Sequence, residues 1–141
     1  MTICVVPIDM QLVAKKPSLA EAIDSFLNSN LPEAPPTDKA WAVYSQDGEA
    51  VRVLGFAGCN LGSRYADVPV FYIEPGSDRQ SKWASAKAAT ALSERMAGFI
   101  SDRLGYGTQV FIRIEPSQEH IWEMFVGRMG AVKAERFVLE V

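Results

Sequence analysis

One construction occurs twice in the second half of the chain, as VPVFYIEP at residues 68–75 and as QVFIRIEP at residues 109–116. In each copy an apolar strand ends in Ile-Glu-Pro, and a polar step then leads into an amphipathic helix. Two strands joined by a helix are usually parallel neighbours in one sheet. Ligands of such sheets bind beyond the carboxyl ends of the strands, where helix amino-termini point. The repeat therefore predicts a site with Glu74 and Glu115 at its mouth.

The first third of the chain predicts one strand, one helix and a stiff connector. Residues 3–6 form a short apolar, strand-like run. Ser18-Leu19-Ala20-Glu21 has the spacing of a capping box, in which a hydroxyl accepts from a first-turn amide while a carboxylate reaches back. We therefore expect a helix from Ser18 to Asn30. Three prolines within residues 31–39 exclude a helix there.

The middle of the chain predicts a hairpin and then a long helix. Strands are expected at residues 40–44 and 51–58, because both runs are rich in β-branched and aromatic residues. Gly48, in the turn between them, can adopt the positive φ that a tight hairpin needs. Apolar residues at three- and four-residue spacing predict a helix over residues 80–104, which Gly105 terminates.

The end of the chain predicts one more helix and one more strand. Ser117 can cap a helix that ends near Gly130, and residues 134–141 read as a closing strand. The predicted order is strand, helix, three-stranded meander, helix, strand, helix, strand. That order is typical of an α+β domain with a mixed, mostly antiparallel sheet flanked by helices. We expect residues 1–141 to form one domain.

Composition favours an ordinary globular protein. Of the 141 residues, 48% are apolar and 22% are charged, and the net charge is -3 at pH 7. That charge gives no general attraction to nucleic acid or to an anionic membrane. Cys4 and Cys59 lie in apolar, strand-like runs without metal-ligand spacing, so no metal site is expected. The apolar start is too short for a signal peptide or a membrane span, and we expect a cytoplasmic protein.

Several phrases of the sequence resemble the GNAT superfamily of N-acetyltransferases. The family's hairpin carries an acidic or polar turn followed by a Val-x-Gly-Phe-like phrase, and residues 47–56 read DGEAVRVLGF. Its next strand ends in a hydrophobic-x-Pro step, which Ile73-Glu74-Pro75 matches. Its last helix ends in an aromatic-rich phrase, and FVGRMGA at residues 125–131 occupies that place. The resemblance covers residue 40 to the end of the chain and implies a GNAT-like fold.

This resemblance implies acetyl-coenzyme A as the acyl donor and an amine, on a small molecule or a protein, as the acceptor. The thioester would lie between the ends of the strands that hold Tyr72 and Ile112. Glu74 would accept the proton of the amine, directly or through water, and Glu115 is the second candidate for this role. The residues implied in binding the donor are Tyr72, Ile73, Arg79, Ser81, Lys82, Ala84, Ala86 and Lys87.

Three positions depart from the family pattern. The family binds pyrophosphate through a (Gln/Arg)-x-x-Gly-x-(Gly/Ala) loop, and the corresponding SKWASA at residues 81–86 has no glycine. The phenol that many members use as a general acid would fall at Val126, which cannot donate a proton. The asparagine expected near the start of the last helix falls at about Glu119. The alternative function is therefore a non-catalytic binding or assembly module, a kind of descendant that also occurs among bacteriophage proteins.

The charged candidates have structural interpretations as well. Glu74 and Glu115 can face solvent or pair with a basic neighbour instead of acting as bases. The cations Arg79, Lys82 and Lys87 can pair with phosphates, or they can form the solvated face of a helix. Both interpretations stay open at the level of sequence.

The remaining candidates are an aromatic residue, a histidine and a strand. Tyr72 can line a ligand slot or belong to the core. His120 is the only histidine, and no catalytic triad or metal site can be assembled around it from the sequence. A homodimer would form if residues 136–141 of two copies paired as strands.

Overall fold

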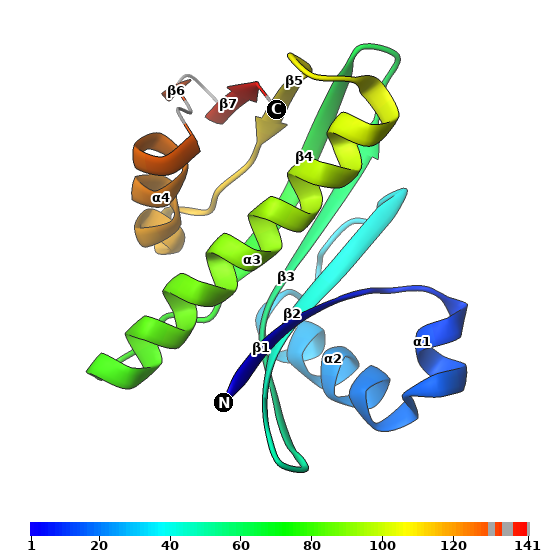
Figure 1. Cartoon of the computed structure of the whole chain (residues 1–141), viewed down its shortest axis with the longest axis vertical. Coiled ribbons are helices and arrows are strands. Elements are labelled where there is room, and N and C mark those ends of the chain that lie inside the picture. Colours follow the sequence, from blue (N-terminus) through cyan, green and yellow to red (C-terminus); the bar gives the residue numbers. More distant parts are fainter. Residues whose placement is uncertain (130–131, 134–136, 141) are drawn as a thin grey trace.

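The computed structural model describes residues 1–129, 132–133 and 137–140. Figure 1 labels the strands and helices in the order in which they follow along the chain. The elements are β1 (Thr2–Pro7), α1 (Met10–Lys15), α2 (Pro17–Asn30), β2 (Lys39–Asp47), β3 (Ala50–Leu61), β4 (Tyr65–Ile73), α3 (Arg79–Leu104), β5 (Gln109–Ile112), the 3₁₀ turn η1 (Pro116–Gln118), α4 (Glu119–Met129), β6 (Val132–Lys133) and β7 (Phe137–Glu140).

The strands form one mixed sheet in the order β1-β2-β3-β4-β5-β7-β6. Every neighbouring pair is antiparallel except β4 and β5, which are parallel. These two strands carry the Ile-Glu-Pro phrases at or just beyond their carboxyl ends, and α3 is the connection between them. The predicted parallel pair and the α+β class with a mostly antiparallel sheet are confirmed.

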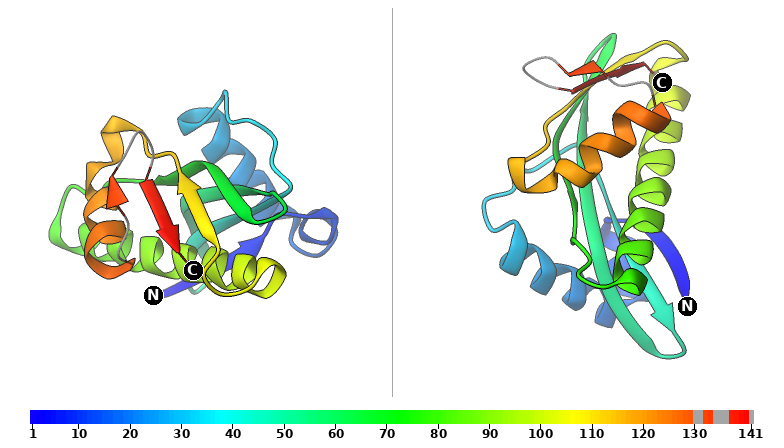
Figure 2. Two further views of the ribbon diagram at one scale, coloured as in Figure 1. Left: turned by 90° about the horizontal axis from the view of Figure 1, so that it is seen from above. Right: turned by 90° about the vertical axis from the view of Figure 1, so that its left-hand side faces the viewer.

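Helices cover both faces of the sheet. Figure 2 shows α2 and α3 on opposite sides of the long strands. The buried side chains accordingly form two clusters. One lies between the sheet and the helices α3 and α4, and it includes Trp41, Phe71, Leu92 and Phe125. The other lies between the sheet and the helices α1 and α2, and it includes Leu12, Ile23, Phe26 and Phe56.

The hairpin and the long helix form where the sequence predicts them. Gly48 has φ 62° in the turn between β2 and β3, a conformation that side chains with a Cβ rarely adopt. α3 spans Arg79–Leu104, within one residue of the predicted start. It ends at Gly105, which has φ 90°. Gly48 and Gly105 each mark the end of an element, so the neighbouring residues were enough to predict the hairpin turn and the end of the helix.

The start of the chain differs from the prediction in two ways. α2 begins at Pro17 rather than Ser18, and no side chain caps it at Lys16. Proline suits the first helical position because its fixed φ is already helical, so the apparent capping box at Ser18 lies inside the helix. A short helix, α1, was not predicted; the carboxylate of Asp9 caps it by accepting from the Leu12 N–H over 3.1 Å.

The final helix begins later than expected. Ser117 lies within the 3₁₀ turn η1 and does not precede the helix as a cap, and α4 starts at Glu119. Pro116 opens this turn, and the Gln118 N–H donates to the Glu115 carbonyl oxygen over 2.8 Å. The extra turn moves the helix start one residue along the chain, from the expected Gln118 to Glu119. The predicted helix end, Gly130, lies outside the described residues.

The predicted closing strand is present as β7. Of the predicted residues 134–141, the structure describes 137–140. β7 pairs with β5 on one side and with β6 on the other, so it is not an edge of the sheet. β1 and β6 are the edges. β6 pairs only with Phe137 and Val138 of β7, so the homodimer expected from pairing of the final strand stays a prediction.

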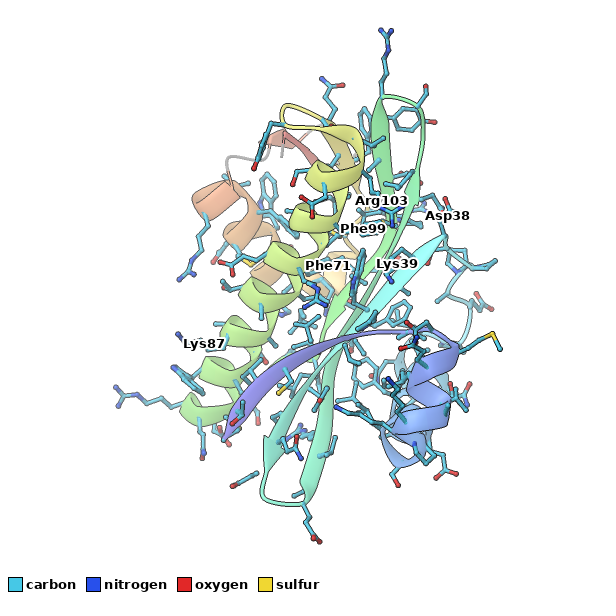
Figure 3. The ribbon with its side chains drawn as sticks, turned by 45° about the vertical axis from the view of Figure 1, so that its right-hand side comes forward. Asp38, Lys39, Phe71, Lys87, Phe99 and Arg103 are labelled. Atoms are coloured by element: carbon cyan, nitrogen blue, oxygen red, sulfur yellow. The ribbon has the colours of Figure 1, made fainter. Side chains whose placement is uncertain are left out.

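Cations lie over aromatic rings near both ends of α3. Lys39 Nζ and the Arg103 guanidinium both lie over the ring of Phe99, at 5.8 and 5.1 Å from its centroid. Figure 3 shows these three side chains gathered near the carboxyl-terminal half of α3, far from Lys87. Lys87 lies over the ring of Trp83 near the other end of the helix.

Among the described helices, none is long and apolar enough to cross a bilayer.

Candidate functional site

A bulge in β4 starts the separation of the two parallel strands. Between Gly58 and Asn60, β3 presents one residue where β4 presents two, Val68 and Pro69. Proline has no backbone N–H, and strands tolerate it at such bulges. The extra residue shifts which backbone groups of β4 face β3 and which face away. The N–H of Ile73 consequently points away from β3.

Beyond the bulge, β4 and β5 part. Their pairing ends at Val68 and Ile112, and the Arg113 N–H makes a last hydrogen bond to the Val68 carbonyl over 3.0 Å. β4 continues to Ile73 alone on this side, while the chain after β5 bends toward α4 (Figure 1). A gap therefore opens between the two strands, and the backbone groups that face it need hydrogen-bond partners.

The side chain of Gln118 fills this gap. It is only 1% exposed, and its Oε1 accepts from the Ile73 N–H over 2.8 Å. Ile121 and Phe125 of α4 are buried beside it, and the Phe125 ring meets Phe71 of β4 edge-on with centroids 5.0 Å apart. An acyl group that entered the gap and accepted from the Ile73 N–H would have to displace Gln118.

A pocket of about 430 Å³ opens next to the filled gap, between α3 and α4. This volume lies within the range of small-molecule sites, roughly 300–1,000 Å³. We call it the α3–α4 pocket. Its walls are Pro75, Gly76, Lys82, Ser85, Ala86, Ala89, Thr90, His120, Ile121, Met124 and Arg128. Three basic side chains and no carboxylate are among these residues, so the pocket favours an anionic ligand.

His120 contributes little positive charge to this pocket at neutral pH. Partial burial lowers the pKa of His120, although the nearby carboxylate of Glu123 opposes the shift. A neutral imidazole offers one hydrogen-bond donor and one acceptor. The full charges at the pocket are therefore those of Lys82 and Arg128.

A second pocket, of about 290 Å³, lies on the other side of the link between β4 and α3. We call it the Glu74 pocket. Its walls are Met1, Ser45, Arg52, Leu54, Glu74, Pro75, Gly76, Asp78, Gln80, Ser81, Ala84 and Ser85. The Arg52 guanidinium pairs with the Glu74 carboxylate over 3.2 Å. The two pockets share Pro75, Gly76 and Ser85, so a group in one lies close to a group in the other.

The link between β4 and α3 is held from both sides. The Ser85 hydroxyl donates to the Glu74 carbonyl oxygen over 2.6 Å, which ties the helix to the strand end. Gly76 packs directly on the first turn of α3, where an added Cβ would collide with the backbone of Ser81 and Lys82. The wall shared by the two pockets is therefore packed closely against α3.

A carboxylate occupies the amino-terminus of α3. Asp78 accepts from the Ser81 N–H over 2.7 Å, and the Ser81 hydroxyl accepts from the backbone N–H groups of Asp78 and Ser77. These bonds hold the pKa of Asp78 below its ordinary value, the bond from the Ser81 N–H most of all. The amide that could otherwise hold a phosphate here is already used, and the carboxylate repels one.

Substitution of Asp78 by alanine should lower the melting temperature at neutral pH, because α3 loses its cap. The folded-state pKa is depressed, so the carboxylate stabilises the fold above the ordinary aspartate pKa of 3.8. This contribution is lost as the pH falls through the depressed value. Melting temperatures of the parent and of Asp78→Ala should therefore converge as the pH falls through the depressed pKa of Asp78. Asp102→Ala, an exposed site on the same helix, is the control; an equal loss there would refute the cap.

The structure distributes the predicted site residues over several environments. Lys82 and Ala86 line the α3–α4 pocket, whereas Glu74, Ser81 and Ala84 line the Glu74 pocket. Glu115 is exposed and lines neither of these two pockets. Arg79 and Lys87 are exposed and line neither the α3–α4 pocket nor the Glu74 pocket.

Two predicted residues lie on β4 itself. Ile73 is fully buried and acts through its backbone N–H. Tyr72 is half-buried on the α2 side, where its hydroxyl hydrogen-bonds Asn30 over 3.3 Å. Burial raises the pKa of Tyr72, and the nearby Glu74 carboxylate adds to the rise, so the phenol stays protonated at neutral pH.

Sequence reasoning missed most of the site residues contributed by η1 and α4. Gln118 and Arg128 were not singled out, Met124 was interpreted only as an apolar helix position, and His120 as an ordinary helix residue. A histidine and an arginine eight positions apart lie on nearly the same helix face, which is a weak signal by itself. Only the packing of α4 against α3 brings Arg128 to Thr90, with Nη1 and Oγ1 3.3 Å apart.

The cysteines supply no nucleophile at either pocket. Burial raises the pKa of the Cys59 thiol to about 11, and Cys59 is fully buried in the sheet. A thiol that stays protonated at neutral pH is unreactive. Cys4 is also a free thiol and lines neither wall.

Comparison with known proteins supports the fold through structure and not through sequence. No model of a known protein family matches the chain, nor does any curated protein. Among solved structures, one that matches is a "putative acetyltransferase" from Exiguobacterium sp. 255-15, determined at 1.52 Å resolution. The TM-score is 0.51 and the identity 16%, over 100% of this chain and 93% of that chain. With its splayed parallel strands and flanking helices, the chain has a GNAT-like α+β fold.

Proposed function

We propose that the chain is an acyl-coenzyme A-dependent N-acyltransferase that transfers an acetyl group to an amine. The observation that carries the proposal is the position of the α3–α4 pocket. It is bounded by Pro75 and Gly76, which follow β4, and by His120 and Ile121, which follow Gln118. A basic pocket with an apolar floor therefore opens where the two parallel strands part, which fits a donor with phosphates and an apolar arm.

The Glu74 pocket supplies a place for the acceptor amine in this proposal. The reaction forms an amide C–N bond and breaks the thioester C–S bond, and the amine loses one proton. Glu74 would accept that proton directly or through water and pass it to solvent. Because the amine attacks the thioester directly, no nucleophile from the protein is needed. Arg52 would hold the carboxylate toward the wall that the two pockets share.

Calorimetry with acetyl-coenzyme A tests binding, and mass spectrometry of amine acceptors tests transfer. A lysine peptide, a polyamine and an aminoglycoside are suitable acceptor probes. Glu74→Gln should lower the transfer rate by about 10²–10⁴-fold and leave donor binding unchanged, since a general base typically contributes that much. Glu115→Gln is the matched control and should behave like the parent. Absence of heat at millimolar acetyl-coenzyme A would refute the proposal.

A second candidate function is a non-catalytic binding module with the same fold. Two contacts favour it: Gln118 fills the gap between β4 and β5, and Asp78 occupies the amino-terminus of α3. Both place the protein's own polar groups where a donor would bind. For this candidate we expect no acetylated product with any of the three acceptors, in the parent or in Glu74→Gln.

A further inference from the structure

The charged walls of the α3–α4 pocket come from two helices that are far apart in the sequence. Lys82 belongs to the first turn of α3, and Arg128 belongs to the last turn of α4. Within the part of the chain that the structure describes, neither of them pairs with a carboxylate. Two cations that face one pocket, with no counter-ion among the described residues, generate a positive potential inside it.

The arginine is held in place at the pocket wall. Its Nη1 donates to the Thr90 Oγ1 of α3 over 3.3 Å, and the Thr90 hydroxyl donates to the Ala86 carbonyl over 3.0 Å. A guanidinium has five N–H donors, so several remain for a ligand after this contact. Guanidinium and phosphate match in geometry and form short, charge-assisted hydrogen bonds.

The floor of the same pocket is apolar. Ala86 and Ala89 come from α3, and Ile121 and Met124 come from α4. Small and flexible apolar side chains accept an alkyl arm or a flat ring without leaving polar groups unpaired. The pocket thus combines an anion-binding rim with an apolar floor.

We propose that Lys82 and Arg128 form a clamp across α3 and α4 that binds the phosphates of a phosphate ester with an apolar arm, and that His120 adds a neutral hydrogen bond. Coenzyme A belongs to this chemical class, and to that extent the inference rests on the proposed function. The clamp replaces binding by the amides at the amino-terminus of α3, where Asp78 already accepts from the Ser81 N–H. Arg79 and Lys87, which lie outside the pocket walls, have no part in it.

Calorimetry with three probes tests the clamp: coenzyme A, pantetheine and inorganic pyrophosphate. Coenzyme A should bind at least tenfold more tightly than pantetheine, which has the apolar arm without the phosphates. Lys82→Gln and Arg128→Gln should each weaken coenzyme A binding roughly tenfold or more, the effect of losing a charge-assisted hydrogen bond. Both variants should also show a smaller loss of affinity with added salt. Lys87→Gln, exposed on the same helix, should bind like the parent.

The possible outcomes separate the clamp from the enzyme. Binding that depends on Lys82 and Arg128 without acetyl transfer supports the clamp and refutes the transferase. Acetyl transfer with parental affinity in both variants refutes the clamp and leaves the transferase. Equal losses in Lys87→Gln and Lys82→Gln would indicate general attraction and would also refute the clamp. No binding of coenzyme A or pyrophosphate at millimolar concentration would refute both; circular dichroism melts confirm that the variants fold.

Discussion

Replacement of Phe125 by alanine should lower the free energy of unfolding by about 3–5 kcal/mol, the usual cost of removing a buried phenylalanine. Phe125 is 0% exposed, and its ring packs edge-on against Phe71 at 5.0 Å between centroids and 74° between planes. Such aromatic pairs contribute beyond the buried area alone. Urea denaturation followed by tryptophan fluorescence measures the change.

Val126→Ala is the matched control for this prediction. Val126 is the next residue of α4 and is 40% exposed, so its truncation should change stability by no more than about 0.5 kcal/mol. The contact between Phe125 and Phe71 fixes α4 against β4, and α4 forms one wall of the α3–α4 pocket. A loss below about 1 kcal/mol in Phe125→Ala would mean that α4 does not pack as described.

The second large effect is expected at Gln118. Gln118→Met keeps a side chain of similar length but removes the acceptor of the Ile73 N–H. A buried donor without a partner costs about 1–3 kcal/mol. Protection of the Ile73 amide against hydrogen exchange should fall selectively, because its only partner in this part of the structure is the Gln118 side chain.

Two internal references make this measurement specific. The neighbouring Glu74 N–H donates to the Leu54 carbonyl over 2.8 Å on the opposite side of β4, and its protection should fall less than that of Ile73. Gln109→Met removes an exposed glutamine at the start of β5 and should leave the Ile73 amide unchanged. If the Ile73 amide kept its full protection in Gln118→Met, another group would be its hydrogen-bond partner, and the assignment of Gln118 to this role would be wrong.

Phe125 and Gln118 close the gap together. Phe125 packs α4 against β4, and Gln118, in the turn before α4, accepts the hydrogen bond of the Ile73 N–H, which β5 no longer reaches after Ile112. The pocket beside them is open and basic, whereas the gap itself is closed. Donor binding in the pocket and acyl transfer in the gap are consequently separable properties, and the experiments proposed above measure them separately.

The main features of the fold were predictable because they depend on neighbouring residues. The two Ile-Glu-Pro phrases predicted a parallel pair joined by a helix, and Gly48 predicted the hairpin turn. The spacing of apolar residues and the positions of glycine and proline are local properties of a chain. The same kind of evidence failed at Ser18, where Pro17 competes for the first helical position, and at Ser117, where a 3₁₀ turn intervenes.

The site was predictable only in outline. The first Ile-Glu-Pro phrase predicted a site with Glu74 at its mouth, and the family resemblance implied Lys82. Both residues line pockets at the end of β4, and their roles stay predictions. Whether Gln118 reaches Ile73, and whether Arg128 reaches Thr90, depends on how α4 packs across α3 and β4. No local pattern encodes a partner 45 or 38 residues away. The order of elements and their periods follow from short-range sterics and apolar spacing, whereas the closed gap and the two-helix pocket follow from long-range packing that only the folded chain creates.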